Sequence, residues 1–220
     1  MRSIGINQCI DILCNLADTI ESKKDFFTEL DSAIGDGDFG VSISLGFHAI
    51  KNSSSSFVGK NIAEILEECS IRFSDNAPST IGILLSTGFL CASSIMVGKD
   101  EIGSLELSTM LKAAIEGIQK RGKADLGDKT ILDALTPAWI VASNMNEMNA
   151  DIDVLLNQIA SAAEKGAEAT RKLKAHKGRS RWLQERSIGH LDPGAVAVAI
   201  ILRICSNYLN EANKIDYIWE

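Results

Sequence analysis

The sequence lacks the features that mark membrane-spanning, nucleic-acid-binding and zinc-binding proteins. No apolar run among its 220 residues approaches the roughly 20 residues that cross a bilayer, and the N-terminus has no signal-peptide pattern. Positive charge is scarce, with 22 Lys and Arg against 29 Asp and Glu, whereas general nucleic-acid binding needs a basic surface. The five cysteines form no C-x-x-C pair, which argues against zinc and indicates buried free thiols. We therefore expect a cytoplasmic protein with no membrane span and no nucleic-acid partner.

A convincing alternating strand pattern is missing as well, and helical periodicity takes its place. Apolar residues recur at three- and four-residue steps in eight segments, with short connections that favour antiparallel neighbours. The segment over residues 81–97 is apolar almost all round, which predicts a central, buried helix. The pattern predicts one all-α domain over residues 1–220, a single-domain antiparallel bundle or barrel of eight helices. The eight segments lie within residues 6–20, 41–50, 62–73, 81–97, 107–118, 131–142, 151–174 and 195–209.

Three junctions rich in Gly and Asp hold the residues with potential chemistry. They cover residues 31–40, 122–130 and 189–195, and each one precedes an apolar helical segment. The N-terminus of a helix offers unpaired N–H groups and the positive end of a dipole. If the three junctions converge, they would form a site for an anion.

The first junction contains a G-x-G-x-x-G pattern that does not fit a dinucleotide-binding loop. No strand precedes it, and its aspartates would face a pyrophosphate with like charge. An EF-hand fails too, because Phe47 stands where the bidentate Glu belongs. What remains is a magnesium site formed by Asp31, Asp36 and Asp38, which supply three hard oxygen ligands on a flexible Gly-containing backbone. The alternative is that the three residues cap helices and form turns, and their spacing leaves both interpretations open.

The second junction is a near miss to a phosphate-binding P-loop. Asp128 stands between Gly127 and Lys129, where the motif G-x-x-x-x-G-K-[ST] has no residue, and no strand leads in. A helix cap by Asp128, with Lys129 and Thr130 in the first turn, explains the pattern at least as well as a nucleotide role.

The third junction follows a basic segment. Residues 165–186 contain eight Lys and Arg against two Glu, and they lead into the Asp192-Pro193-Gly194 turn. Arg can clamp phosphate oxygens with two hydrogen bonds. The segment therefore indicates docking of phosphate or of a partner, although a solvated surface would also account for a run of charge.

Together, the three junctions resemble the L subunit of dihydroxyacetone kinase, the nucleotide-binding domain of that family. The matching segments are residues 30–38, 127–138 and 177–195, and they occur in the family's order over almost the full chain. The resemblance implies an antiparallel barrel of eight helices with the nucleotide at one end. It also implies that Asp31, Asp36 and Asp38 hold two magnesium ions that bridge the phosphates of ADP or ATP.

The resemblance also implies which residues surround the nucleotide, and three of them depart from the family's pattern. Phe39 replaces a His, Ser42 replaces an Asn, and Ile81 stands where a Ser of the phosphate loop is expected. The aspartates of the metal site are retained, whereas the phosphate and adenine contacts are altered. The implied nucleotide contacts are Phe39, Gly40, Val41, Ser42, Ser79, Thr80, Ile81, Gly82, Gly122, Ile131, Arg179, Arg186, Asp192, Pro193 and Gly194.

The function implied by the resemblance is phosphoryl transfer to a hydroxyl of a small ketose or triose. A separate K-type subunit would hold that substrate, and this chain would supply only metal and phosphate ligands. The phosphoryl donor is ATP or a protein of the phosphotransferase system that rephosphorylates bound ADP, and the basic segment is a candidate dock for an acidic partner. The altered phosphate loop motivates an alternative, a non-catalytic or regulatory relative that binds a partner or a lipid-like ligand.

Overall fold

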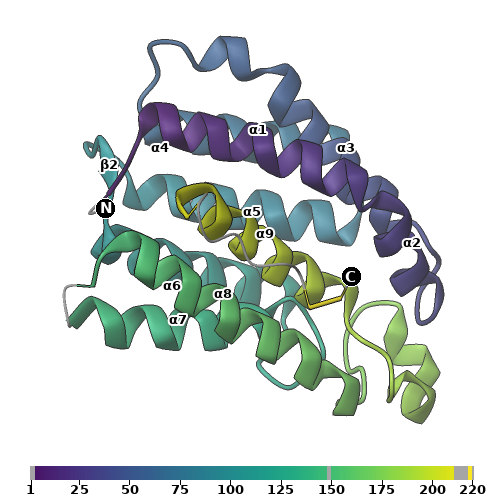
Figure 1. The fold of residues 1–220 in the computed structure, drawn as a ribbon. Coiled ribbons are helices and arrows are strands. Elements are labelled where there is room, and N and C mark those ends of the chain that lie inside the picture. Colours follow the sequence, from purple (N-terminus) through teal and green to yellow (C-terminus); the bar gives the residue numbers. More distant parts are fainter. Residues whose placement is uncertain (1–2, 148–149, 211–217, 220) are drawn as a thin grey trace.

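The chain folds into helices, and the connection that runs over residues 170–192 is longer than the others (Figure 1). The computed structural model describes residues 3–147, 150–210 and 218–219, and these contain nine α-helices, three short 3-10 segments and one pair of two-residue strands. The helices are α1 (Ile6–Ser22), α2 (Lys24–Ser32), α3 (Phe39–Asn52), α4 (Ile62–Asn76), α5 (Thr80–Ile95), α6 (Ser104–Gly122), α7 (Leu132–Glu147), α8 (Ile152–Ala169) and α9 (Pro193–Leu209). The 3-10 segments are η1 (Ser54–Phe57), η2 (Thr170–Lys172) and η3 (Ser180–Ser187), and β1 (Ile4–Gly5) pairs antiparallel with β2 (Glu101–Ile102).

The predicted all-α architecture is confirmed, and the eight long helices close into a ring. Helices α3 to α9 each pack against the next one along the chain, α1 packs against α3, and α9 returns to pack against α1. The ninth helix, α2, was not expected. It is a nine-residue helix that buries only Phe27 among its side chains, so its periodic signal is weak. The helix expected to reach residue 174 ends at Ala169 and continues as η2.

The prediction of a buried central helix over residues 81–97 is wrong. Helix α5 lies in the wall of the ring, where Ile83 is 40% and Leu90 is 51% exposed. The inner face of α5, with Leu85 and Phe89, borders an apolar cavity of about 240 Å³ inside the ring. A helix that borders an apolar cavity needs as many apolar residues as a helix in a filled core. The apolar sequence of residues 81–97 therefore could not show that α5 lies in the wall of the ring.

One buried ion pair joins α8 to α9. Arg203 is 1% exposed, and its Nε and Nη2 donate to the two carboxylate oxygens of Glu164 at 2.8 and 2.7 Å. Nη1 donates to Asn157 and Nη2 also donates to Ser161, so four of the five guanidinium donors have partners among the described residues and the buried charge is paired. Among the described residues, no helix combines the length and the apolar character needed to span a bilayer.

Candidate functional site

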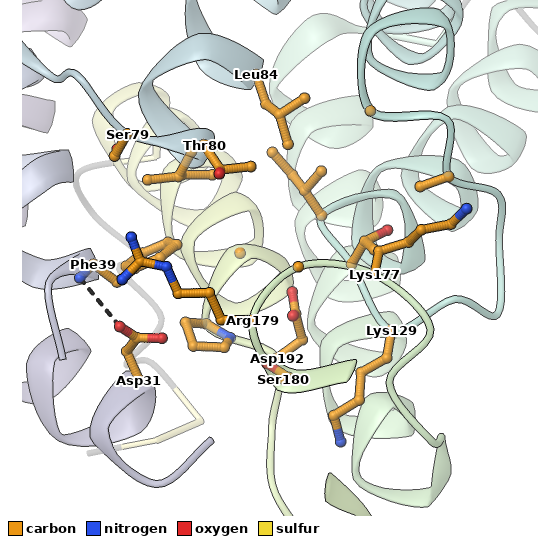
Figure 2. A pocket seen from close by; sticks show the side chains of 18 of the residues that line it. Asp31, Phe39, Ser79, Thr80, Leu84, Lys129, Lys177, Arg179, Ser180 and Asp192 are labelled. Atoms are coloured by element: carbon orange, nitrogen blue, oxygen red, sulfur yellow. Dashed lines mark hydrogen bonds between the residues drawn. The ribbon is translucent and has the colours of Figure 1, made fainter. Parts of the chain in front are cut away.

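The three Gly- and Asp-rich junctions meet at one cavity of about 180 Å³ (Figure 2). Its walls come from the α2–α3 junction, the start of α5, the end of α6, the start of α7, the segment before η3 and the start of α9. The lining residues are Asp31, Asp36, Asp38, Phe39, Ser79, Thr80, Ile81, Leu84, Ile118, Gly122, Ala124, Lys129, Thr130, Ile131, Leu132, Lys177, Gly178, Arg179, Ser180, Asp192, Pro193 and Gly194.

The first junction brings three carboxylates together on this wall. Asp31, Asp36 and Asp38 each offer an oxygen atom, and the three atoms lie within 4.8 Å of one another. Asp31 lies in the last turn of α2, and its Oδ2 accepts hydrogen bonds from the backbone N–H groups of Gly37 at 2.9 Å and Phe39 at 3.3 Å, which hold it in place. Asp38 stands at the N-cap of α3, but its side chain makes no cap hydrogen bond. Its carboxylate is therefore available to another partner.

The negative charge of this cluster is balanced in part by Arg179. The Arg179 guanidinium forms an ion pair with Asp36 and approaches Asp38 at 3.4 Å. Burial raises the pKa of Asp38, and the negative charge of Asp31 raises it further, so both effects disfavour a bare carboxylate at this position. Three converging carboxylate oxygens that need a positive partner are a donor set that fits Mg²⁺.

Helix N-termini form the adjacent walls. The Ser79 Oγ caps α5 by accepting from the Gly82 N–H at 3.2 Å, and Asp192 Oδ2 caps α9 by accepting from the Ala195 N–H at 2.8 Å. Burial raises the pKa of Asp192 to about 7, against the cap hydrogen bond, which lowers it. The positive ends of these helix dipoles favour an anion in the cavity.

The prediction that Asp128 caps the helix after the second junction is wrong. Its Oδ2 accepts instead from the Asp125 N–H at 2.9 Å, and α7 begins only at Leu132. Asp133 secures this junction from inside the helix, since its two oxygens accept from Gly127 N–H and Thr130 N–H at 2.7 Å each. Asp133, in the first turn of α7, thus accepts the backbone hydrogen bonds at this junction that were expected of Asp128.

Most predicted site residues line the cavity, and five do not. The five are Gly40, Val41, Ser42, Gly82 and Arg186. The two glycines are instead required for helix packing. A Cβ on Gly40 would collide with the backbone of Lys24, and a Cβ on Gly82 would collide with the backbone of Ala77. Val41 and Arg186 are exposed, and Ser42 is buried within α3.

Sequence reasoning missed the apolar part of the wall. Leu84 on α5, Ile118 on α6 and Leu132 on α7 border the cavity beside the predicted Ile131. These residues belong to ordinary helical repeats, which carry no signal that separates a site from the core. Lys177 and Gly178 were part of the recognised motif, but their place in the wall depends on the path of the chain between α8 and α9.

Relatives of this chain support the comparison of motifs. It is 34% identical over 203 residues to "PEP-dependent dihydroxyacetone kinase 2, ADP-binding subunit DhaL" of Listeria innocua, covering 91% of this chain and 94% of the relative. It is 31% identical over 202 residues to "PEP-dependent dihydroxyacetone kinase, ADP-binding subunit DhaL" of Escherichia coli, covering 92% and 96%. Among solved structures, the dihydroxyacetone kinase from C. freundii in complex with AMP-PNP and Mg²⁺ shares the fold, with a TM-score of 0.72 and 22% identity over 91% of this chain and 34% of that one.

The family model described as the DAK2 domain matches residues 33–207. This range contains the second and third junctions and most of the first, including Asp36 and Asp38. The chain therefore belongs to the DAK2 domain family, and it is a kinase subunit of the DhaL type.

Proposed function

We propose that this chain is the nucleotide- and magnesium-binding subunit of a dihydroxyacetone-type kinase, and that it acts with a separate K-type subunit that holds a small ketose or triose. The observation that carries the proposal is the convergence of three carboxylate oxygens within 4.8 Å on a cavity that is also bordered by helix N-termini. A site of this kind combines metal ligands with donors for phosphate oxygens.

Each wall of the cavity would have a distinct task. Asp31, Asp36 and Asp38 would hold two Mg²⁺ ions, which supply charge neutralisation at the transferred phosphoryl group when bound. Backbone N–H groups at the starts of α5 and α9 would donate to phosphate oxygens. Arg179, already beside the carboxylates, would add a cation at the same place.

The apolar wall would accept the base of the nucleotide. Leu84, Ile118 and Leu132 present aliphatic carbon close to the polar junctions, so one cavity offers a polar and an apolar side. We place no general base in this chain, because the sugar hydroxyl would reach the phosphoryl group from the K-type subunit.

We infer ADP as the resident nucleotide and a phosphotransferase-system protein as the donor. The relatives that this chain covers almost completely are PEP-dependent, ADP-binding subunits, and a relative in Lactococcus lactis is named PTS-dependent. The exposed basic side chains of Arg181 and Arg186, with Trp182 at 72% exposure between them, suit an acidic partner surface.

Two measurements test the proposal. Calorimetry is expected to show ADP binding that requires Mg²⁺ and is lost in an Asp36→Ala, Asp38→Ala double variant. Reconstitution with a K-type subunit is expected to yield turnover with a phosphotransferase-system donor and none with ATP alone. Unchanged nucleotide affinity in the double variant would contradict the metal site, and turnover with ATP alone would contradict the donor assignment.

The apolar cavity inside the ring favours a second candidate, binding of an apolar, lipid-like ligand by a non-catalytic relative. Its lining is almost entirely hydrocarbon and sulfur, with Phe47, Leu85 and Phe89 among the bordering side chains. Extraction of the purified chain and mass spectrometry of the extract tests it. Turnover in the reconstituted complex would reject the non-catalytic interpretation, whatever the cavity holds.

A further inference from the structure

Lys129 belongs to the junction that narrowly misses the pattern of a phosphate-binding P-loop, and its side chain does not bind at the anion site. It is 2% exposed, and its amino group lies apart from the Asp31 carboxylate and the Arg179 guanidinium (Figure 2). Its backbone adopts φ 61°, in the left-handed region that glycine enters most easily. A lysine in this conformation needs compensating contacts, and these contacts are not with the anion site.

Four backbone carbonyl oxygens surround the Lys129 ammonium. Its Nζ donates to Thr170 and Ser187 at 2.8 Å each, to Leu173 at 3.2 Å and to His190 at 2.6 Å. An ammonium has three N–H donors, so two of the four acceptors share one. Hydrogen bonds to a charged donor are stronger than neutral ones, and they replace water that a buried ammonium cannot reach.

The four acceptors lie at the two ends of one exposed segment. We call residues 174–186 the basic arm; Thr170 and Leu173 precede it, and Ser187 and His190 follow it. The arm contains Arg179, and the chain after it leads to Asp192.

Five further contacts join the two ends. The Ala175 N–H donates to Ser187 Oγ at 2.9 Å, the Gly189 N–H donates to the Arg171 carbonyl at 2.7 Å, and the Asp192 N–H donates to Thr170 Oγ1 at 2.9 Å. The Arg171 guanidinium donates to the Gly189 carbonyl at 3.3 Å, and Lys174 pairs with Glu185 at 3.0 Å. Of all these groups, the Lys129 ammonium is the one that reaches both ends from outside the segment.

We propose that Lys129 is a positioning residue of the nucleotide site, because its ammonium fastens both ends of the basic arm and thereby sets Arg179 and Asp192 at the cavity. The expected effect on nucleotide binding rests on the proposed function, but the hold of Lys129 on both ends of the basic arm can be measured without nucleotide. The opposite wall, with Asp31, Asp36 and Asp38, belongs to the α2–α3 junction and has no hydrogen bond to Lys129 among the described contacts.

The first test follows backbone hydrogen exchange in the nucleotide-free chain. In a Lys129→Met variant we expect faster exchange across residues 171–192 and unchanged exchange in α1, α3 and α4. Lys112→Met serves as a control, because Lys112 is an exposed lysine of α6 whose contact with Glu116 is at 4.0 Å. Unchanged exchange over residues 171–192 would overturn the inference. Loss of protection throughout the chain would also overturn it, since it would assign Lys129 to global stability.

The second test separates positioning from loss of stability. Glu164→Gln breaks the buried ion pair with Arg203 and destabilises the contact of α8 with α9 away from the cavity. At a temperature where both variants remain folded, we expect Lys129→Met to weaken Mg²⁺-dependent ADP binding by about tenfold, because binding must then order the arm. Glu164→Gln is expected to bind as the wild type does. Equal affinities for the two variants would contradict the positioning role.

The outcomes distinguish this inference from the proposed function. If the wild type binds no nucleotide but Lys129→Met still loosens residues 171–192, the proposed function fails and the fastening stands. If the wild type binds and Lys129→Met binds equally well, the positioning role fails alone. Should Lys129→Met not fold, Lys129→Gln keeps two N–H donors, and local loosening in that variant supports the inference while global unfolding rejects it.

Discussion

The three clustered aspartates differ in what each one contacts. Asp31 accepts backbone hydrogen bonds from Gly37 and Phe39, whereas Asp36 and Asp38 face Arg179. Asp31 thus stabilises the turn into α3. Asp36 and Asp38 contact only the Arg179 guanidinium among the ion pairs of the described residues, and Mg²⁺ could replace that guanidinium. Their substitution should therefore have different consequences for folding and for binding.

Asp36→Asn is expected to weaken Mg²⁺-dependent ADP binding and leave thermal stability unchanged. The loss should reach at least about tenfold, the lower end of what even an indirect metal partner contributes. Asp31→Asn is expected to lower both the affinity and the melting temperature, because the carboxylate that accepts two backbone N–H groups loses its charge. Calorimetry and thermal unfolding of the two variants check this. A melting temperature that falls equally in both would argue against the division.

The raised pKa of Asp192 predicts a dependence of stability on pH. Its folded pKa of about 7 lies above the ordinary 3.8, so the folded state binds a proton more tightly than the unfolded state. The resulting stabilisation is complete below about pH 4 and is lost as the pH rises through about 7. Asp192→Asn keeps a cap acceptor and removes the titration. Its free energy of unfolding should improve relative to the wild type between pH 4 and 8 in urea titrations. Parallel curves for the two proteins would show that Asp192 does not titrate in this range.

At the scale of the helices, the caps of α4 and α5 form a matched pair. Asn61 caps α4 through the Glu64 N–H at 3.0 Å, and Ser79 caps α5 through the Gly82 N–H. Only Ser79 lies on the cavity. Comparing variants of the two caps therefore distinguishes an effect on helix stability from an effect on nucleotide affinity.

Ser79→Ala and Asn61→Ala are each expected to lower the free energy of unfolding by about 1 kcal/mol, the usual effect of losing a cap. Ser79→Ala should in addition weaken ADP binding, because the start of α5 then loses its fixed orientation at the cavity. Asn61→Ala should bind ADP as the wild type does. The prediction fails if the two variants lose affinity alike.

The sequence predicts the long helices well, since each has an apolar face that must be buried. Its errors lie where a contact depends on the chain path. Lys129 and Asp128 are neighbours in a motif that indicates a cap or a phosphate contact, yet the ammonium of one meets carbonyls from residues 41 to 61 positions away. The carboxylate of the other meets Asp125. No local pattern encodes the distant partners of Lys129, whereas the contact of Asp128 with Asp125 is a local turn that the comparison with a P-loop did not suggest.

At the scale of the whole molecule, the ring leaves an interior that its apolar side chains do not fill. Gly88 lies on this cavity, and a Cβ there would meet Ile118 Cδ1 at 3.6 Å and Ala114 Cβ at 3.9 Å, which are ordinary contacts. Gly46 is different, because a Cβ there would collide with the Phe73 ring. These two helical glycines test how much room the interior offers.

Gly88→Ala is expected to raise the free energy of unfolding by about 1 kcal/mol, because alanine favours the helix and the added methyl finds space. Gly46→Ala, with the same gain in helix propensity, is expected to lower it, because the Phe73 ring must move. Chemical denaturation of both variants measures the two changes in the free energy of unfolding. Destabilisation by Gly88→Ala would mean that the interior is packed more tightly than the cavity indicates.

The closed ring has a consequence for how the molecule is made. Its seam joins α1 to α9, and the Tyr208 hydroxyl on α9 donates to Asp11 on α1 at 2.9 Å across 197 positions of sequence. Contacts this distant form late, and α9 is also the helix whose first turn, with Asp192 and Gly194, completes the cavity. During translation, the contact that closes the ring cannot form until α9 has been synthesised. We therefore expect the ring and the proposed anion site to be completed together, after α9 has left the ribosome.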